Sequence, residues 1–377
     1  MVKLLIGGSP CTYWSIAQTK NRETVAEGIG WELFLNYRIA RDKYKPDYFL
    51  YENNKSMSPA IRAQITRELG LEPVLINSAL VSAQNRKRLY WVGKRNPDGT
   101  YSKVDVEQPE NRGILLRDIL ETNITNEENT YPLCVAQRGR YANRGGGQTE
   151  QRYEARPDQK TSTLTTVQKD NLVAEPIRIG TVDQTSNSQG YRVYSPEGKG
   201  VTLCGNGGGV GGKTGLYAVP VFETADGKQM PVYEVRNGFI TIKGTQYPIK
   251  LADGIYIIRK LTVTECKRLQ TVPDDYAFPV SNAQAYKMLG NGWTVDVIAH
   301  IMSHFDFGKE PAAVLSMYDG MSCGRIALEK LGVEVERYYA TEIDKYAIKT
   351  TMHNYPDTIQ LGDAFAVRTD MFEGVLW

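Results

Sequence analysis

The stretch LLIGGSPCTYWS, residues 4–15, decides the fold class of this sequence. Its apolar run over residues 4–6 breaks into two glycines, and Cys11 then follows a proline. An apolar run that ends in glycines is typical of a buried strand that turns at its carboxyl end. We therefore expect a strand whose end presents a thiol to a cleft. A buried cysteine that only packs is the alternative.

The next eighty residues alternate between helical and strand patterns. The spacing of apolar residues and the Ser-Pro and Gly boundaries support this assignment. The predicted helices cover 24–44 and 58–70, and the predicted strands cover 48–51, 73–77 and 89–92. Such alternation predicts an α/β fold with a mostly parallel sheet and helices on both faces.

The pattern changes over 96–255, where helical periodicity fades and glycine, threonine, asparagine and tyrosine dominate. Short strands with polar, partly basic loops fit this region best. A disordered linker is the alternative, and the many tyrosines, valines and isoleucines argue against it. We predict an α/β domain in two parts, 1–95 and 256–377, interrupted by a β-rich domain over 96–255.

The second part of the α/β domain repeats the strand–helix pattern. We expect a strand, a threonine-capped helix and a proline turn over 257–276, and a loop with one long amphipathic helix over 285–305. Two strand–helix units and a third strand follow over 312–332, 335–355 and 358–365.

The composition is that of an ordinary globular protein. Of 377 residues, 41% are hydrophobic, and the formal charge of +2 does not itself indicate a nucleic-acid binder, although 84–95 holds five basic residues and no acid. Five scattered cysteines without a CxxC pair argue against a disulfide scaffold and for a reducing compartment. His300 and His304 have metal-ligand spacing but no suitable third ligand nearby, so no metal is expected. The sequence contains no signal peptide and no apolar run of about 18 residues, which predicts a cytoplasmic protein without a membrane span.

Three predicted strands of the second part end in acidic residues. Asp319, Gly320 and Gly324 form a glycine turn, Glu342 ends the next strand, and Asp363 follows the third. An acid about twenty residues after such a turn commonly binds ribose hydroxyls. Because parallel strands end at one edge of a sheet, these residues together predict a pocket for a nucleoside cofactor.

A second group of chemical residues is expected at the same edge. Glu52 ends a predicted strand, as Cys11 does, and Arg86 and Arg88 lie two residues apart on an extended segment. Nearby arginine favours a reactive thiolate and can hold a carbonyl or phosphate. Such a group, facing a nucleoside cofactor, is suited to covalent activation of a ring.

Six segments of the sequence resemble the motifs of the cytosine-C5 DNA methyltransferases. They are GGSPC (the Pro-Cys motif), YENNKSM (the Glu-Asn motif), VSAQNRKRLYWVG (the Gln-x-Arg-x-Arg motif), RKLTVTECKRLQTVPDDY, LGNGWTVDVIAHI (the Gly-Asn motif) and VLSMYDGMSCG (the cofactor motif, with Tyr318 in the usual Phe place). The resemblance implies a Rossmann-like methyltransferase sheet and leaves 96–255 as a target-recognition domain. Asn54 departs mildly from the Glu-Asn-Val pattern.

The resemblance also implies roles for individual residues. Cys11 would attack C6 of a flipped-out cytosine in duplex DNA, Glu52 would act at N3, Arg88 would contact the ring carbonyl, and Arg86 would lie closer to the thiolate or a phosphate. S-adenosyl-L-methionine would be bound by Tyr318, Asp319, Gly320, Gly324, Glu342, Ile343, Asp363, Asn291 and Trp293. The residues expected to contact DNA are Gln84, Arg138, Arg140, Arg144 and Lys213.

The order of these motifs differs from the usual order in the family, in which the cofactor motifs come first. Here the Pro-Cys motif comes first and the cofactor motifs come last, which predicts a circular permutation. The alternative is a chain cut from a longer or fused gene. The resemblance further implies a monomer of prokaryotic or phage type with a possible companion restriction endonuclease. A pyrimidine methylase of RNA or free nucleotides and a non-catalytic DNA-binding relative remain as alternatives.

Overall fold

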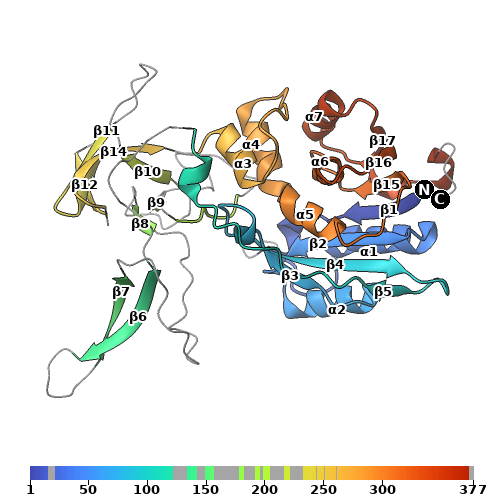
Figure 1. Cartoon of the computed structure of the whole chain (residues 1–377), viewed down its shortest axis with the longest axis horizontal. Coiled ribbons are helices and arrows are strands. Elements are labelled where there is room, and N and C mark those ends of the chain that lie inside the picture. The colour runs from blue at the N-terminus through green and yellow to red at the C-terminus, as the bar shows by residue number, and fades with distance from the viewer. Residues whose placement is uncertain are drawn as a thin grey trace.

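The computed structural model describes residues 1–15, 22–121, 134–141, 149–156, 178–181, 192–195, 198–203, 216–220, 232–242, 244–249, 251–259 and 261–372. Its largest feature is an eight-stranded sheet in the order β17-β16-β15-β1-β2-β4-β3, with β5 paired to β4 (Figure 1). The strands are β1 (Val2–Gly7), β2 (Tyr48–Asn54), β3 (Val74–Asn77), β4 (Lys87–Arg95), β5 (Tyr101–Lys103), β15 (Ala312–Met317), β16 (Val335–Thr341) and β17 (Ile359–Gly362).

The sheet is mixed and rich in parallel pairs. The pairs from β17 to β2 are parallel, whereas β4 runs antiparallel to β2, β3 and β5. The connection between β3 and β4 is short and contains the 3-10 turn Ser78–Leu80. A parallel pair would need a long crossover, so this short connection requires antiparallel pairing. The α/β expectation is therefore confirmed, while the prediction of parallel pairing does not extend to β3 and β4.

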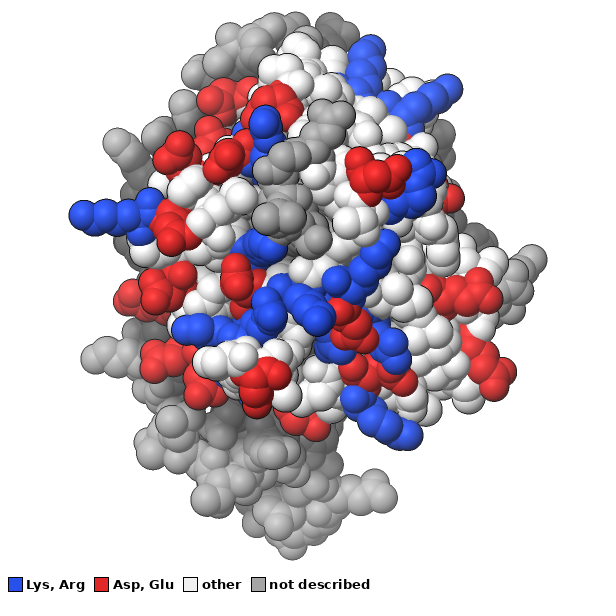
Figure 2. All heavy atoms as spheres, turned by 90° about the vertical axis from the view of Figure 1, so that its right-hand side faces the viewer, with Lys and Arg blue, Asp and Glu red and all other residues white. Residues whose placement is uncertain are grey.

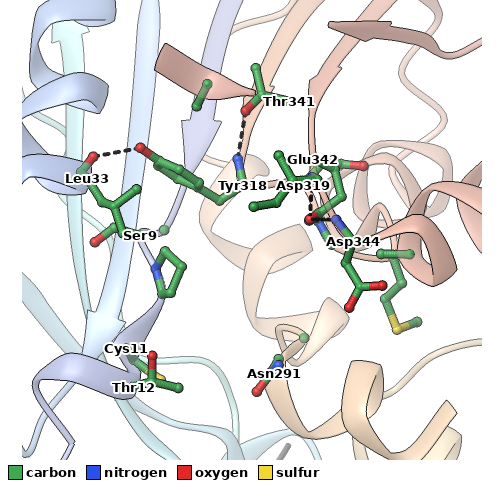
Figure 3. Close-up of a pocket in the computed structure, with 18 of the residues that line it drawn as sticks. Ser9, Cys11, Thr12, Leu33, Asn291, Tyr318, Asp319, Thr341, Glu342 and Asp344 are labelled. Carbon is green, nitrogen blue, oxygen red and sulfur yellow. Dashed lines mark hydrogen bonds between the residues drawn. The ribbon is translucent and has the colours of Figure 1, made fainter. Parts of the chain in front are cut away.

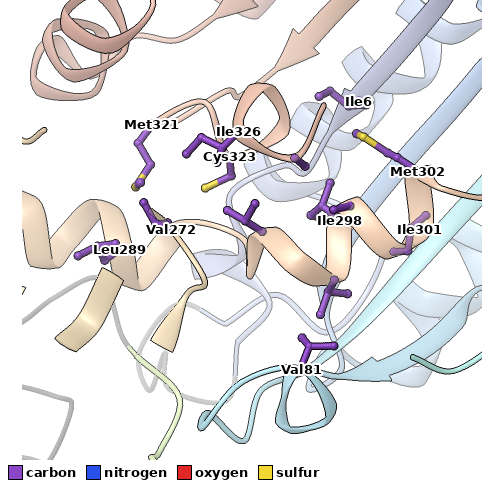
Figure 4. Packing of buried hydrophobic residues seen from close by; sticks show 14 of the residues in the cluster. Ile6, Val81, Val272, Leu289, Ile298, Ile301, Met302, Met321, Cys323 and Ile326 are labelled. Atoms are coloured by element: carbon purple, nitrogen blue, oxygen red, sulfur yellow. The ribbon is translucent and has the colours of Figure 1, made fainter. Parts of the chain in front are cut away.

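Helices cover both faces of this sheet. Along β1, Leu4 and Ile6 belong to one buried cluster and Leu5 to the other, because successive strand side chains point to opposite faces. The helices α1 (Ile29–Tyr44) and α2 (Pro59–Leu69) pack on the Leu5 side. On the Ile6 side lie α5 (Val295–Met302), α6 (Cys323–Lys330) and α7 (Lys345–Asn354), as Figure 4 shows for Ile298, Met302 and Ile326.

The close packing of α6 on β1 depends on a glycine. A Cβ atom added at Gly324 would lie 2.2 Å from Cδ1 of Ile6, and Ile6 is fully buried. A glycine at this place in a strand–turn–helix unit permits close contact between helix and strand. This contact gives Gly324 a packing role, and its expected contact with the cofactor stays a prediction.

The expected helix boundaries are confirmed where capping residues define them. Ser58 caps α2 by accepting from the backbone N–H of Ile61 at 3.2 Å, and Gly70 ends the helix with φ of 74°. Thr262 and Glu265 form a capping box at the start of α3 (Val263–Leu269). The helix predicted from residue 24 begins only at Ile29.

The segment 285–305, predicted to hold a loop and one long amphipathic helix, is formed by two helices. The first, α4 (Asn282–Asn291), ends at Gly292, and α5 starts after Thr294. Gly292 and Thr294 both have extended backbone angles, with ψ of 166° and 107°, so the helix breaks and restarts. This break places Trp293 between two helix ends.

The region predicted to be β-rich contains two further sheets, at the left of Figure 1. One is the hairpin of β6 (Cys134–Tyr141) and β7 (Thr149–Arg156). The other has the order β13-β12-β11-β14-β10-β9-β8 and is antiparallel except for the parallel pair β9–β10. Its strands are β8 (Arg178–Thr181), β9 (Arg192–Tyr194), β10 (Leu216–Pro220), β11 (Val232–Arg236), β12 (Phe239–Ile242), β13 (Thr245–Pro248) and β14 (Gly254–Arg259).

A short strap, residues 198–203, joins this region to the large sheet. Gly200 pairs with Gln84 as a parallel bridge: its N–H donates to the carbonyl of Ala83, and its own carbonyl accepts from Asn85 N at 3.0 Å. Lys199 donates from Nζ to the carbonyl of Ser82 at 3.1 Å. The strap is therefore attached to the loop before β4 by main-chain hydrogen bonds and by the Lys199 side chain.

The surface at the right-hand end of Figure 1 is mixed in charge. Figure 2 shows basic side chains gathered near the centre of this face with acidic side chains around them. Among the described residues, no helix is long and apolar enough to cross a membrane.

Candidate active site

A cavity of about 490 Å³ lies at the carboxyl ends of β1, β2, β15, β16 and β17. Cys11 and Glu52 line one end of it, and Tyr318, Glu342 and Asp363 line the other. Figure 3 shows Cys11 and Thr12 on one side of this space and Asn291 on the other. Since strands from the two ends of the sequence are adjacent in one sheet, their loops enclose a single space.

The turn after β1 presents the Cys11 thiol. A 3-10 turn, Cys11–Tyr13, starts after Pro10, and the Cys11 carbonyl accepts from the N–H groups of Trp14 and Ser15. Asn54 Nδ2 donates to the same carbonyl at 3.3 Å. The nucleophile candidate is thus fixed by its main chain while its side chain remains partly exposed at the cavity.

The carboxylate of Glu52 is held by two donors. Arg88 Nε lies 3.0 Å from Oε1, and Trp293 Nε1 donates to Oε2 at 3.0 Å. In the antiparallel pair β2–β4, Glu52 is opposite Tyr90 and Asn54 is opposite Arg88, so Arg88 is the diagonal neighbour of Glu52. Glu52 itself is only 8% exposed. These two donors fix the carboxylate at the wall of the cavity that Cys11 also lines.

Arg86 is buried and serves mainly the backbone. Its guanidinium donates to the carbonyls of Leu203 and Gly290 at 3.2 Å and of Gly292 at 3.0 Å. Burial, and next the charge of Arg88, lower the pKa of Arg86 to about 10. Arg86 also lines the cavity that Cys11 lines, and its expected place near the thiolate or a phosphate stays a prediction.

The turn after β15 is held in an uncommon backbone conformation. Tyr318, Gly320 and Ser322 have φ of 60°, 62° and 58°, and left-handed angles at non-glycine residues cost on the order of 1 kcal/mol each. The carboxylate of Asp319 fixes the turn by accepting from Ser316 Oγ at 2.6 Å, from Tyr338 Oη at 2.8 Å and from Ser322 Oγ. Burial raises the pKa of Asp319 to about 6.

Glu342 occupies the position expected for a ribose-binding acid. Its carboxylate accepts from three backbone N–H groups, those of Gly320, Ile343 and Asp344, each at 2.8 Å. These bonds connect the turn after β15 to the turn after β16 and fix the carboxylate at the cavity wall (Figure 3).

Two apolar side chains stand exposed at the cavity. Ile343 is 77% exposed and Phe365 is 56% exposed, and both line the space beside Asp363. Asp363 caps the short turn Ala364–Ala366 by accepting from the N–H of Phe365 at 3.0 Å. Exposed apolar side chains at a cavity are typical of a binding site for a flat ring. Phe365 was not predicted from the sequence, although an aromatic residue two positions after Asp363, the acid that follows β17, could have indicated it.

Tyr318 connects the turn after β15 to α1. Its hydroxyl donates to the carbonyl of Leu33 at 2.8 Å, and its backbone N–H donates to Thr341 Oγ1 at 3.1 Å (Figure 3). Burial raises the pKa of Tyr318 to about 12, so the phenol stays protonated as a donor. Lys287, also not anticipated from the sequence, pairs with Asp344 at 2.7 Å between α4 and α7 at the same cavity.

Of the residues expected to contact DNA, Gln84 is the one whose side chain the structure describes. Gln84 is fully buried, and neither polar atom of its side chain has a hydrogen-bond partner among the described residues. The strap over 198–203 covers it, so its predicted DNA contact is corrected to a buried position at the strap. Arg138 and Arg140 lie on β6, where only the backbone is described, and Arg144 and Lys213 lie outside the described residues.

The residues of the cofactor end suit a nucleoside with an amino-acid chain. The cavity has the volume of a typical small-molecule site. It combines a fixed carboxylate at Glu342, a second acid at Asp363 and apolar faces at Ile343 and Phe365, while Asn291 and Trp293 line the end toward Glu52. Within the described part of the chain, no group of three His, Cys, Asp or Glu residues is arranged to hold a metal ion.

Comparisons with known proteins identify the family of this chain. The family model for C-5 cytosine-specific DNA methylase matches residues 1–305. The orphan methyltransferase M.SPBetaI of Bacillus phage SPbeta is 27% identical over 301 residues, covering 71% of this chain and 68% of the relative. The orphan methyltransferase M.SPRI of Bacillus phage SPR is 25% identical over 365 residues, covering 79% and 81%. Type II methyltransferase M.HhaI of Haemophilus parahaemolyticus is 29% identical over 144 residues, covering 38% and 33%. Among solved structures, the Entamoeba histolytica methyltransferase EhMeth aligns over 80% of this chain and 76% of its own, with 12% identity and a TM-score of 0.43.

Proposed function

The chain belongs to the C-5 cytosine-specific DNA methylase family and is a DNA cytosine-5-methyltransferase, and we propose that it methylates a cytosine flipped out of duplex DNA with Cys11 as the nucleophile. One observation carries this proposal: a single cavity joins the thiol of Cys11 and the carboxylate of Glu52 to the nucleoside-type site around Glu342. A stacked base cannot enter such a space, so the target must leave the helix at a cost of a few kcal/mol.

The methyl donor of this family is S-adenosylmethionine, and when bound it supplies an electrophilic methyl group that C5 of the activated cytosine attacks. Glu342 would hold its ribose, Asp363 its adenine amine, and Ile343 and Phe365 the two faces of the adenine ring. Asn291 and Trp293 would contact the methionine end. The fixed carboxylate and the two exposed apolar side chains support this assignment.

Cytosine C5 is a weak nucleophile, so the protein must activate the ring. The Cys11 thiolate would form a bond to C6, and the electron pair of the C5–C6 double bond would move toward C5. Glu52, held by Arg88 and Trp293, would face N3 and the exocyclic amine of the ring. After C5 is methylated, loss of the C5 proton and breakage of the bond between C6 and sulfur would restore the double bond and release Cys11.

Arg88 and Arg86 would have different roles in this scheme. Arg88 pairs with Glu52 through Nε, donates from Nη1 to the carbonyl of Lys87, and would present Nη2 to the ring carbonyl. Arg86 would place positive charge near the thiolate while it holds the loop before Trp293. The β-rich region over 96–255 would contact the target sequence, with Arg138, Arg140, Arg144 and Lys213 as candidate contacts.

We further propose that the motif order is circularly permuted. β15 ends in the cofactor turn and pairs in parallel with β1, which ends in Cys11, with Val2 opposite Ala312. The family match ends at residue 305, before β15, β16 and β17. A rearranged chain with 309–377 placed ahead of 1–308 should fold and methylate DNA. Loss of folding in that chain would contradict the permutation.

Tritiated S-adenosylmethionine with duplex DNA, transfer RNA and deoxycytidine monophosphate as substrates tests the main proposal. We expect label in duplex DNA, whereas label only in RNA or in the nucleotide would overturn it. Duplex DNA containing 5-fluorocytosine should trap a covalent adduct with the wild-type protein and not with Cys11→Ala. Cys266→Ala, which removes a buried thiol outside the cavity, is the matched control and should still trap the adduct. Bisulfite sequencing of DNA from expressing cells would give the target site.

The phage and type II relatives suggest how the protein works in the cell. We propose that it acts as a monomer of prokaryotic or phage type, either as an orphan enzyme or beside a companion restriction endonuclease. Cutting of DNA at the site found by bisulfite sequencing, in extracts of the host, would identify such an endonuclease.

A further inference from the structure

The side chain of Trp293 belongs to two parts of the site at once. Its ring lines the cavity on the side of Asn291, where the cofactor would lie. Its indole N–H donates to Glu52 Oε2 at 3.0 Å, across 241 residues of sequence. Because Arg88 engages the other oxygen, Glu52 is held from two separate elements.

The position of the indole is determined by its surroundings. The carbonyl of Gly292, directly before it, accepts from Arg86 at 3.0 Å and from Gln270 Nε2 at 3.2 Å. The hydroxyl of Thr294, directly after it, is hydrogen-bonded to Gln270 Oε1 at 2.9 Å and to Ser78 Oγ at 2.8 Å. Trp293 is therefore fixed by its neighbours on both sides.

The opposite wall leaves room for this contact only because residue 8 is a glycine. A Cβ atom there would lie 2.8 Å from the Glu52 carbonyl, 3.0 Å from Oε2 and 3.5 Å from Trp293 Nε1. The first two distances are shorter than nearly all real contacts of a Cβ atom. The glycine just before Ser9, Pro10 and Cys11 thus accommodates the carboxylate and its indole donor together.

We propose that Trp293 is a positioning residue for the catalytic carboxylate as well as a wall of the cofactor site. Its N–H fixes Oε2 of Glu52 in the orientation that meets the cytosine ring, whether or not the cofactor is bound. Without that donor, a buried carboxylate oxygen would lose its partner and the side chain would turn to find another. This inference rests on the proposed function, because it concerns activation of the same ring.

A reaction that needs no cofactor separates the two roles of Trp293. When Cys11 adds to C6, C5 accepts a proton from water, and reversal of the addition can release the original C5 hydrogen. With duplex DNA carrying tritium at C5 of cytosine, tritium released to water therefore measures ring activation alone. The affinity for S-adenosylhomocysteine, measured by calorimetry, shows only the contribution of Trp293 to the wall of the cofactor site.

Two variants should show opposite effects. Trp293→Phe keeps an aromatic wall and loses the N–H, so tritium release should fall on the order of tenfold while cofactor affinity stays within about twofold. Trp293→His keeps a ring N–H at the place of the indole nitrogen and loses the larger apolar surface. It should retain most of the tritium release and bind the cofactor more weakly.

Trp91→Phe is the matched control, because Trp91 donates its indole N–H to Thr66 Oγ1 at 3.1 Å in the core and does not line the cavity. It should leave both measurements unchanged. Tritium release by Trp293→Phe equal to that of Trp91→Phe would overturn the inference and leave the proposed function standing. Wild-type protein that neither releases tritium nor methylates DNA would overturn the proposed function and this inference with it.

Discussion

Replacing Gly324 with alanine introduces a methyl group where α6 touches β1. The new Cβ would lie 2.2 Å from Ile6 Cδ1, whereas carbon atoms in ordinary contact are about 3.5–4.0 Å apart. Ile6 is fully buried and Gly324 is buried, so Ile6 has little room to turn aside. Overpacking of this kind costs about 1–3 kcal/mol, and the higher helix propensity of alanine offsets up to about 1 kcal/mol.

The clash involves a single atom, which allows a double-mutant cycle. Ile6→Val removes Cδ1 and alone should cost about 0.5–1.5 kcal/mol. In the double variant the nearest atoms to the new methyl group would be the Tyr338 hydroxyl at 3.2 Å and Cγ1 of residue 6 at 3.6 Å. We expect the two losses to be less than additive by about 2 kcal/mol in urea unfolding, because the second change relieves the first.

The same variants test whether Gly324 touches the cofactor. S-adenosylhomocysteine should bind the double variant as it binds wild type, because Gly324 does not line the cavity. Additive stability losses would refute the packing argument. Weakened cofactor binding in the stable double variant would instead support the prediction that Gly324 contacts the cofactor.

Two further predictions follow from buried charges. Because the pKa of Asp319 is raised to about 6 from 3.8, its contribution to stability is present in full below about pH 4 and is lost as the pH rises through 6. In cofactor-free protein this contribution amounts to at most about 3 kcal/mol. Asp319→Asn should therefore flatten the pH dependence of the free energy of urea unfolding between about pH 4 and 6. If the free energy of unfolding depended on pH in the variant as it does in wild type, the raised pKa of Asp319 would be contradicted. Arg86→Lys should lower the free energy of unfolding by about 2–4 kcal/mol, because lysine cannot reach three carbonyls at once. Arg38→Lys, a partly exposed control, should stay within about 1 kcal/mol, and equal losses in the two variants would refute the role of Arg86.

Much of the fold could be predicted because its signals are local. The Ser58 cap, the Gly70 end of α2 and the capping box at Thr262 each depend on residues within one helical turn. The clustering of strand ends at one edge also follows from the strand–helix pattern alone, which is why Cys11 and Glu342 could be expected at one cleft.

The pairing of residues within the site could not be predicted in this way. Which arginine meets Glu52 depends on the antiparallel register of β2 with β4, and antiparallel pairing of that segment was not expected. The break before Trp293 depends on backbone angles that the apolar spacing does not encode. Gln84 appeared to be a DNA contact because its motif is basic, yet a segment 116 residues later covers it.

The strap over residues 198–203 has a consequence for how target specificity can change. The hydrogen bonds of Gly200 with Ala83 and Asn85, and the bond from Arg86 to Leu203, all use main-chain groups of the strap. Main-chain groups are common to every amino-acid sequence except for the missing N–H of proline. If the region over 96–255 recognises the target as proposed, it could be exchanged for one of different sequence that keeps the strap, with Lys199 and Thr202, which also donate from their side chains to the carbonyls of Ser82 and Asn85.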